Sequence, residues 1–399
     1  MLYRKMPKNG DELSILGFGC MRLASKADGS IDEERAKKQV RTAIDSGVNY
    51  IDTAWPYHMG ASEPFLGHAL AGGYREKVKL ATKLPSWLIE KREDMDKYLN
   101  AQLEKLQTDH IDYYLVHALV GDLWDTVEKL GVREFLDAAK ADGRIRNAGF
   151  SFHGAAEDFS RIVDAHNWDF CQIQYNFLDE NNQAGTKGLK YAAKKGLGVI
   201  IMEPLRGGNL TRTVPQAVKE IWDTAPVKRT PAEWALRWIW NHPEVTVVLS
   251  GMNEEDHVAE NIRIAGHAMP NSLTKEELQL IRRVEKKYRE LMKVGCTACQ
   301  YCMPCPSGVN IPLCFEEYNN LGMVENPEAE KFMYAARLGG AVGTGEPSYA
   351  SLCVQCRECV DKCPQHIEIP DVLESVVKEF EGSGFTERVA MARQAFKQI

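Results

Sequence analysis

The chain has 399 residues, enough to bury a large core and to form two domains. Hydrophobic residues make up 44% of it and charged residues 26%, which excludes wholesale disorder. The formal net charge of −7 argues against nucleic acid as the main partner, because phosphate binding needs a basic face. No apolar run reaches the roughly 18 residues of a membrane helix, and the first residues lack the apolar stretch of a secretory signal. The sequence therefore predicts a cytoplasmic protein that binds neither nucleic acid nor a membrane.

The chain opens with a predicted β-hairpin, in which Asn9 and Gly10 separate two extended segments. Strand-like segments then alternate with helix-like segments of roughly 10–15 residues. Eight segments are predicted to be strands: LGFG, VNYI, VKLAT, DYYLV, RNAGF, FCQIQ, GVIIM and VTVVL. The first helix between them has a predicted start at Asp32, an N-cap residue, and a predicted stop at Gly47.

This alternation of strands and helices predicts parallel βαβ units. Eight such units in about 250 residues match the size of a (β/α)₈ TIM barrel. The alternative is a doubly wound open sheet, but LGFGCMRL has only Gly17 and Gly19 where a dinucleotide-binding sheet carries three glycines and a helix. We therefore predict a barrel over residues 1–290, ending in the helix SLTKEELQLIRRVEKKYRELMKVG. Residues 291–399 are predicted to form a mainly α-helical domain, with helices in IPDVLESVVKEFE and TERVAMARQAFKQI.

Polar residues follow three neighbouring predicted strands at their carboxyl ends, where parallel barrels carry catalytic groups. Asp52 follows the second strand, Tyr57 lies one loop later, Lys83 follows the third strand and His117 follows the fourth. Each alone could simply satisfy backbone groups. Together they predict a proton donor: a lysine stabilises the tyrosine anion, an aspartate pairs with the lysine, and a histidine orients a carbonyl oxygen. Such a site can reduce an aldehyde or ketone when a cofactor supplies hydride.

Eight segments in order resemble the aldo-keto reductases over residues 1 to about 270: GFGCMRL, IDTAWPYHMGASEPFLGHAL, KLATKLP, DYYLVH, GFSFHG, QIQYN, IMEPLRGG and SGMNEEDHVAEN. The resemblance implies a catalytic tetrad of Asp52, Tyr57, Lys83 and His117 acting on a small carbonyl substrate. It also implies a nicotinamide cofactor across the barrel mouth. The residues implied to bind the cofactor are Gly19, Cys20, Met21, Ser151, Gln172, Met202, Glu203, Leu205, Arg206, Gly207, Gly208, Ser250, Gly251, Met252, Asn253, His257, Glu260 and Asn261.

The chain departs from the family pattern at positions that bear on the choice of cofactor. Met202 stands where many members stack a tyrosine on the nicotinamide, and Gly251 and His257 stand where a lysine and an arginine usually bind a 2′-phosphate. Without those cations a phosphate loses charge-assisted hydrogen bonds. Arg206 and Arg263 are the candidates to replace them. The choice between NADH and NADPH stays open.

Nine of the 11 cysteines lie between residues 296 and 363, which in a reducing compartment indicates metal binding rather than disulfides. The second of two arrays, CVQCRECVDKCP, has the spacing with which bacterial ferredoxins bind iron–sulfur clusters. The first array, CTACQYCMPCP, differs by one residue in its last gap, and an Ile-Pro pair follows each array. The two arrays are therefore predicted to be an internal duplication.

The region resembles dicluster ferredoxin domains, in which the Cys-Pro cysteine of each array binds the cluster of the other array. The expectation is two [4Fe–4S] clusters. The ligands of the first are Cys296, Cys299, Cys302 and Cys363, and those of the second are Cys353, Cys356, Cys359 and Cys305. Zinc also binds Cys-x₂-Cys, but it needs paired ligands rather than triplets closed by Cys-Pro. Cys314 has no place in this scheme.

Nicotinamide transfers two electrons as hydride and each cluster accepts one, so connecting them normally needs a flavin, for which the sequence has no motif. Three functions are open. In the first, the barrel reduces a carbonyl compound with NAD(P)H, and the clusters are structural or meet a partner. In the second, ferredoxin or flavodoxin delivers electrons through the clusters to a substrate beside Tyr57. The third is a redox-sensing binding module, against which the complete tetrad argues. The sequence thus predicts an oxidoreductase acting on a carbonyl substrate.

Overall fold

The computed structural model describes residues 1–212, 214–322, 327–341 and 346–396. The chain divides into two compact units: the first comprises residues 1–205 and 232–275, and the second comprises residues 206–231 and 276–399. The domain boundary near residue 290 falls at the end of helix α11 (Lys275–Leu291) and stays a prediction. No helix in these described ranges combines the length and the apolar character needed to cross a bilayer.

The first unit contains a closed, parallel, eight-stranded barrel in the order β10-β3-β4-β5-β6-β7-β8-β9. Its strands are β3 (Leu16–Gly19), β4 (Tyr50–Asp52), β5 (Lys79–Leu84), β6 (Ile111–Leu119), β7 (Ile145–Phe152), β8 (Phe170–Gln174), β9 (Gly198–Met202) and β10 (Val245–Ser250). Each of them overlaps a predicted strand, so the predicted barrel is confirmed. The strands are buried on both faces, which is why they read as almost continuous apolar runs.

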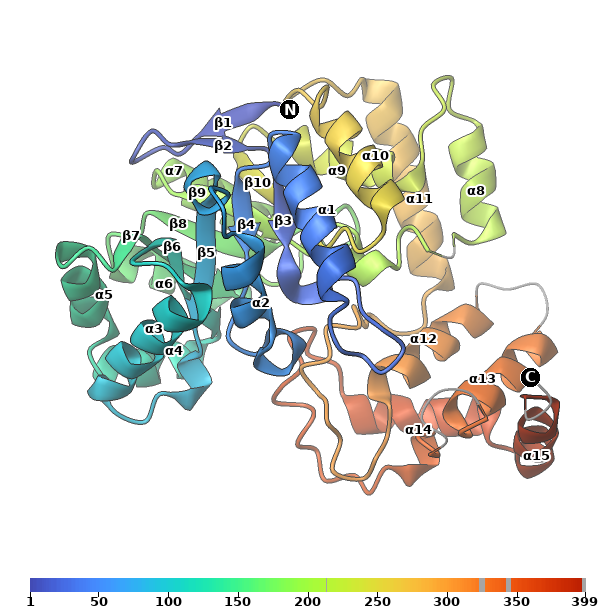
Figure 1. Ribbon diagram of the computed structural model, residues 1–399. Helices are drawn as coiled ribbons and strands as arrows, with labels where there is room; N and C mark the ends of the chain where they lie inside the picture. Colours follow the sequence, from blue (N-terminus) through green and yellow to red (C-terminus); the bar gives the residue numbers. More distant parts are fainter. Residues whose placement is uncertain (213, 323–326, 342–345, 397–399) are drawn as a thin grey trace. The chain divides into compact units, whose positions relative to one another are not determined.

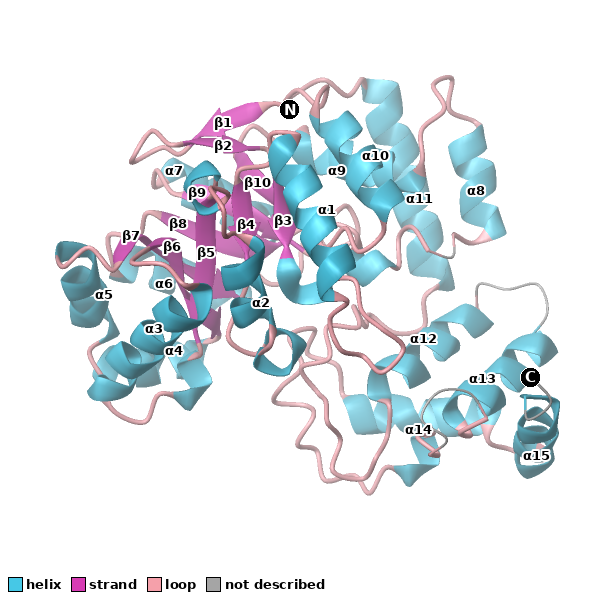
Figure 2. Cartoon of the chain, viewed as in Figure 1, coloured by secondary structure: helices cyan, strands magenta, loops and turns pink. Residues whose placement is uncertain are grey.

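Helices join successive strands and surround them, as Figure 2 shows by cyan ribbons outside the magenta strands. They are α1 (Glu33–Asp45), α2 (Ser62–Ala69), α3 (Arg92–Leu106), α4 (Gly121–Lys129), α5 (Val132–Ala141), α6 (Ala156–Ala165), α7 (Gly185–Lys194), α9 (Pro231–Trp240) and α10 (Glu255–Ala265). Both predicted ends of α1 are confirmed. The Asp32 carboxylate accepts a hydrogen bond from the backbone N–H of Arg35 at 3.3 Å, and Gly47 lies just past the helix with a φ of 98°.

The predicted hairpin is present and lies across one end of the barrel strands (Figure 1). It consists of β1 (Tyr3–Lys5) and β2 (Glu12–Ser14). Its loop is longer than a two-residue turn, although Asn9–Gly10 lies within it. Met6 and Leu13 join the interior cluster that contains Tyr113 and Phe170, whose rings meet edge to face at 5.1 Å. The hairpin thus packs at the end of the barrel where the strands begin, and the carboxyl ends of the parallel strands meet at the opposite end.

The second unit is mainly helical. Its helices are α8 (Gln216–Asp223), α11, α12 (Ile311–Leu321), α13 (Pro327–Leu338), α14 (Ile369–Phe380) and α15 (Phe385–Phe396). The last two confirm the helices predicted near the end of the chain. The first cysteine array lies in the loop between α11 and α12, and the second lies between α13 and α14.

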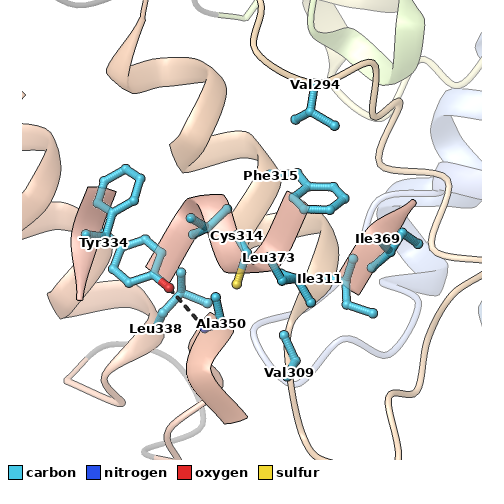
Figure 3. Packing of buried hydrophobic residues seen from close by; sticks show 12 residues of the cluster. Val294, Val309, Ile311, Cys314, Phe315, Tyr334, Leu338, Ala350, Ile369 and Leu373 are labelled. Atoms are coloured by element: carbon cyan, nitrogen blue, oxygen red, sulfur yellow. Dashed lines mark hydrogen bonds between the residues drawn. The ribbon is translucent and has the colours of Figure 1, made fainter. Parts of the chain in front are cut away.

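Cys314 lies in the hydrophobic core of the second unit, beside Phe315 and near Tyr334 and Leu373 (Figure 3). The Tyr334 ring stacks on Phe380 at 4.3 Å, and its hydroxyl accepts a hydrogen bond from Ala350 N at 3.0 Å. Burial raises the pKa of the Cys314 thiol, so the group stays neutral. The cysteine that the ligand scheme left over is therefore a small core side chain.

Candidate functional site

Three of the four predicted catalytic residues form one bonded cluster at the carboxyl end of the barrel strands. Lys83 Nζ donates hydrogen bonds to Asp52 Oδ1 and to the Thr53 carbonyl, both at 2.7 Å. It also donates to the Tyr57 hydroxyl at 3.4 Å. The fourth residue, His117, has its ring centroid 6.1 Å from that of Tyr57, with the ring planes nearly perpendicular. The strand order explains this convergence, because Asp52, Lys83 and His117 belong to the neighbouring strands β4, β5 and β6.

Burial controls the protonation of this cluster. Lys83 is fully buried, and burial lowers its pKa while Asp52 opposes the shift. Burial raises the pKa of Tyr57 well above its usual value, and the charge of Asp52 adds to the shift. Burial also lowers the pKa of His117 well below its usual value, with Lys83 as the next cause. We expected the lysine to favour the tyrosine anion, but burial outweighs it, so the phenol keeps its proton and the imidazole is neutral at pH 7.

The backbone around Tyr57 is in a conformation that side chains rarely adopt. Tyr57 begins the 3₁₀ segment η2 (Tyr57–Gly60), in which His58 and Met59 have φ of 51° and 56°. Leu23 N donates a hydrogen bond to His58 Nε2 at 3.0 Å, which helps to hold the segment. Backbone strain of this kind gathers at functional sites. The side chain of Trp87, partly exposed, lies 5.1 Å from the His117 ring and gives the site an apolar border.

A second layer of buried polar residues, which sequence reasoning missed, supports Lys83. Gln102 Nε2 donates hydrogen bonds to the Lys83 carbonyl at 2.9 Å and to Glu63 Oε1 at 2.7 Å. Thr82 Oγ1 also donates to Glu63 Oε1, at 2.7 Å. One sequence signal could have indicated this layer. Glu63 on α2 and Gln102 on α3 are polar residues that lie on the apolar, buried faces of their helices.

Ser151 and Gln172, the residues implied to meet a nicotinamide carboxamide, are register partners on β7 and β8. Ser151 Oγ accepts a hydrogen bond from Ala118 N at 2.7 Å. Gln172 Nε2 contacts Met202 Sδ at 3.6 Å. Gln172 Oε1 is buried and has no hydrogen-bond partner within the described part of the chain. A buried amide oxygen in this state suits a ligand that donates an N–H, as a carboxamide does.

The other residues implied to bind the cofactor fall into three places. Gly19, Cys20 and Met21 follow the end of β3, and the buried Cys20 adjoins the Asp52–Lys83 pair. Ser250, Gly251, Met252, Asn253, His257, Glu260 and Asn261 lie at the end of β10 and on α10, where Asn261 Nδ2 donates to Ser250 Oγ at 2.9 Å. Met202 ends β9, and Glu203 and Leu205 follow it in the first unit, whereas Arg206, Gly207 and Gly208 belong to the second unit.

Both arginines considered as replacements for a phosphate-binding cation make protein contacts. Arg206 is buried; its Nη2 donates to the Gly295 carbonyl at 2.9 Å and its Nη1 contacts Met292 Sδ at 3.1 Å. Nearby, Asn209 Nδ2 donates to the Cys296 carbonyl at 3.2 Å. Arg263 pairs with Glu233 at 2.8 Å. The segment that follows β9 is thus bonded to the backbone at the start of the first cysteine array.

Two cavities in the second unit are lined by the predicted ligand sets. The first cavity, with an empty volume of about 310 Å³, is lined by Cys296, Cys299, Cys302 and Cys363. The second cavity, of about 380 Å³, is lined by Cys305, Cys353, Cys356 and Cys359, and Cys302 also borders it. Each set combines three cysteines of one array with the Cys-Pro cysteine of the other. Among the described residues, no three His, Cys, Asp or Glu side chains are placed to hold a single metal ion.

The two arrays share one backbone conformation. Two positions of each array have positive φ without being glycine: Ala298 and Gln300 in the first, Gln355 and Arg357 in the second. Ala298 N donates to Cys296 Sγ at 3.3 Å, and Gln355 N donates to Cys353 Sγ at 3.4 Å. These amides would stabilise thiolates, as an iron–sulfur cluster requires. Four sulfur donors around each cavity, supported in this way, fit a [4Fe–4S] cluster.

Two family models match the chain. The model of the aldo/keto reductase family matches residues 15–286, and the model of a 4Fe-4S dicluster domain matches residues 295–368. The two matches cover the barrel strands and all eight cysteines that line the cavities.

Individual relatives are moderately similar. Aldo-keto reductase YhdN of Bacillus subtilis is 30% identical over 227 residues, which are 53% of this chain and 64% of the relative. The uncharacterized oxidoreductase YrpG of the same organism is 26% identical over 327 residues, with 71% and 96% covered. Among solved structures, the holo form of aldo-keto reductase AKR11C1 from Bacillus halodurans is 27% identical, has a TM-score of 0.59, and covers 71% of this chain and 96% of its own.

Proposed function

Because the chain belongs to the aldo/keto reductase family and carries a 4Fe-4S dicluster domain, we propose that it reduces an aldehyde or ketone at Tyr57 with a nicotinamide dinucleotide. One observation carries this proposal. Lys83 Nζ lies within hydrogen-bond distance of both the Asp52 carboxylate and the Tyr57 hydroxyl in a buried site. This is the arrangement that a tyrosine needs to give up its proton to a carbonyl oxygen.

Each residue of the cluster has a defined role in this proposal. A bound nicotinamide supplies hydride to the carbonyl carbon. Tyr57 donates its proton to the carbonyl oxygen, so that the product is an alcohol and the residue becomes a phenolate. Lys83 stabilises that phenolate, and Asp52 holds Lys83 in place. His117 is neutral and orients the carbonyl oxygen toward Tyr57.

The protonation of the site predicts the pH dependence of the reaction. The pKa of Tyr57 lies well above its usual value of about 10, so the residue keeps its proton as the pH rises through neutrality. We therefore expect kcat for carbonyl reduction to be nearly constant from about pH 7 to about pH 9. Alcohol oxidation needs the phenolate and should become faster as the pH rises. Steady-state rates at saturating substrate in both directions test this, and a loss of reduction centred near pH 8 would contradict it.

Gln172 should contribute to binding of the nicotinamide carboxamide through its buried Oε1. Gln172→Leu keeps the approximate volume and removes the acceptor, so we expect the Kd of the nucleotide to rise about tenfold. Fluorescence titration measures the Kd. Cys171→Ala is the matched control, because the neighbouring side chain on a strand points to the other face. Equal affinities of wild type and Gln172→Leu would remove Gln172 from the cofactor site.

For the second unit we propose two [4Fe–4S] clusters, one in each cysteine cavity, with the ligand sets that line them. One observation favours a second function, in which the protein accepts electrons from a carrier protein such as ferredoxin or flavodoxin. In the second ligand set Cys356 is exposed, whereas the four cysteines of the first set are half-buried. An exposed ligand gives a carrier access to the cluster that it holds.

Electron paramagnetic resonance of anaerobically purified protein, before and after adding NADH or NADPH, tests how these functions are connected. A reduced-cluster signal with nucleotide would show that electrons pass from the barrel to the clusters. A signal with dithionite alone would show that intact clusters are not reduced by nucleotide. Turnover of a panel of aldehydes and ketones tests the barrel in the same preparation, and a complete absence of turnover and of nucleotide binding would overturn the proposed reduction.

A further inference from the structure

We propose that the hydroxyl group of Thr297 donates a hydrogen bond to a sulfur atom of the cluster in the first cavity and makes that cluster easier to reduce. The inference rests on the proposed function, in which cysteines lining this cavity hold a cluster. It concerns a residue between two ligands, Cys296 and Cys299, that is not itself a ligand.

Thr297 is buried and its side chain lacks a partner in the protein. The residue is 1% exposed, and its Oγ1 has no hydrogen-bond partner among the described residues. Buried hydroxyl groups are nearly always hydrogen-bonded. The unpartnered hydroxyl of Thr297 therefore indicates a hydrogen-bond partner that the described residues do not supply.

The position of Thr297 identifies that partner. Thr297 lines the first cavity together with the four cysteines of the ligand set. Much of the remaining wall is apolar and includes Ile311, Phe315 and Ile369. A cluster seated among the cysteines would present sulfur atoms to this wall, and sulfur accepts hydrogen bonds from hydroxyl groups.

The internal duplication supplies a comparison within the molecule. The residue that corresponds to Thr297 in the second array is Val354, which follows Cys353 as Thr297 follows Cys296. Val354 is 69% exposed and has no donor. Since both arrays share the same left-handed positions and the same N–H to Sγ contact, the loop conformation does not require a hydroxyl at this place. The hydroxyl of Thr297 is therefore available for a role toward the cluster.

A hydrogen bond to a cluster sulfur stabilises the form with more negative charge, which is the reduced form, and so raises the reduction potential. Thr297→Val should therefore shift the midpoint potential of the first cluster to a more negative value, because it removes the donor and keeps the branched shape. Thr297→Ser keeps the donor and should leave the potential at its wild-type value.

The experiment is a dithionite titration of the anaerobically purified full chain, followed by electron paramagnetic resonance, with iron and sulfide determined on each sample. A Cys356→Ala background, which keeps only the first cluster, assigns the signal. Val354→Thr is the matched control: its hydroxyl would face water, and both potentials should stay unchanged.

The potential and the iron content report on different claims. Wild-type protein without iron would overturn the proposed clusters. Full iron with an unchanged potential in Thr297→Val would overturn only the role of Thr297. A negative shift that Thr297→Ser does not show would support it. Should Thr297→Val fail to retain iron, Thr297→Ala removes the donor with less change of shape and gives the same two readings.

Discussion

Replacement of Tyr57 by phenylalanine is expected to slow carbonyl reduction by about 10²–10⁴-fold while the iron content of the protein stays unchanged. The phenol hydroxyl lies 3.4 Å from Lys83 Nζ, and phenylalanine has the same ring without the hydroxyl. Hydride transfer would then have to proceed without protonation of the carbonyl oxygen. Single-turnover rates at saturating nucleotide measure the loss, and nucleotide affinity should change little.

Tyr50→Phe is the matched control for this variant. Tyr50 lies on β4, two residues before Asp52, and its buried hydroxyl has no hydrogen-bond partner in the described ranges. Removing that hydroxyl should leave the reduction rate within about twofold, because the Tyr50 side chain packs in the interior cluster with Met6 and Leu13 of the hairpin. Turnover of Tyr57→Phe at the wild-type rate would show that another residue donates the proton.

Cys299→Ala and Cys363→Ala should each remove about half of the iron, and the same half. The two cysteines belong to different arrays but line the same cavity. Cys356→Ala should remove the other half, since Cys356 lines the second cavity. Iron and sulfide analysis gives the amounts, and electron paramagnetic resonance of the reduced samples shows which signal is lost.

Cys314→Ala provides the control for these cysteine variants. Cys314 is buried in the core of the second unit and lines neither cavity, so iron should stay at the wild-type level while the midpoint of thermal unfolding falls slightly. Full iron in Cys299→Ala would contradict the ligand assignment. Loss of the same signal from Cys363→Ala and Cys356→Ala would contradict the exchange of ligands between the arrays.

The barrel could be predicted because its strands are short, apolar and separated by helices with clear ends. The positions of Asp52, Lys83 and His117 followed from the rule that parallel strands end at one mouth. The support of Lys83 by Gln102 and Glu63 could not be predicted, because nothing local in two helices shows that their polar side chains meet. The direction of the pKa shift of Tyr57 was also beyond the sequence, since it depends on how much water the fold excludes.

The spacing along each array predicts three ligands of one cluster, and the resemblance to dicluster ferredoxins supplied the fourth, the Cys-Pro cysteine of the other array. The backbone that creates this spacing could not be predicted. Ala298 and Gln355 adopt left-handed backbone conformations, for which glycine is the usual residue. Because neither residue is glycine, the sequence does not indicate these conformations. The hydrogen bond from Arg206 to the Gly295 carbonyl could not be predicted either, because the two residues are far apart in the sequence.

The hydrogen bonds from Arg206 and Asn209 to the carbonyls of Gly295 and Cys296 have a thermodynamic consequence. They join residues 206–209, which follow β9, to the backbone at Cys296, a proposed ligand of the first cluster. A ligand that alters these bonds changes the free energy of holding the cluster. By linkage, the cluster changes the affinity for that ligand by the same factor. Binding of such a ligand and occupancy of the first cluster would then be coupled equilibria, even if no electron passes between them.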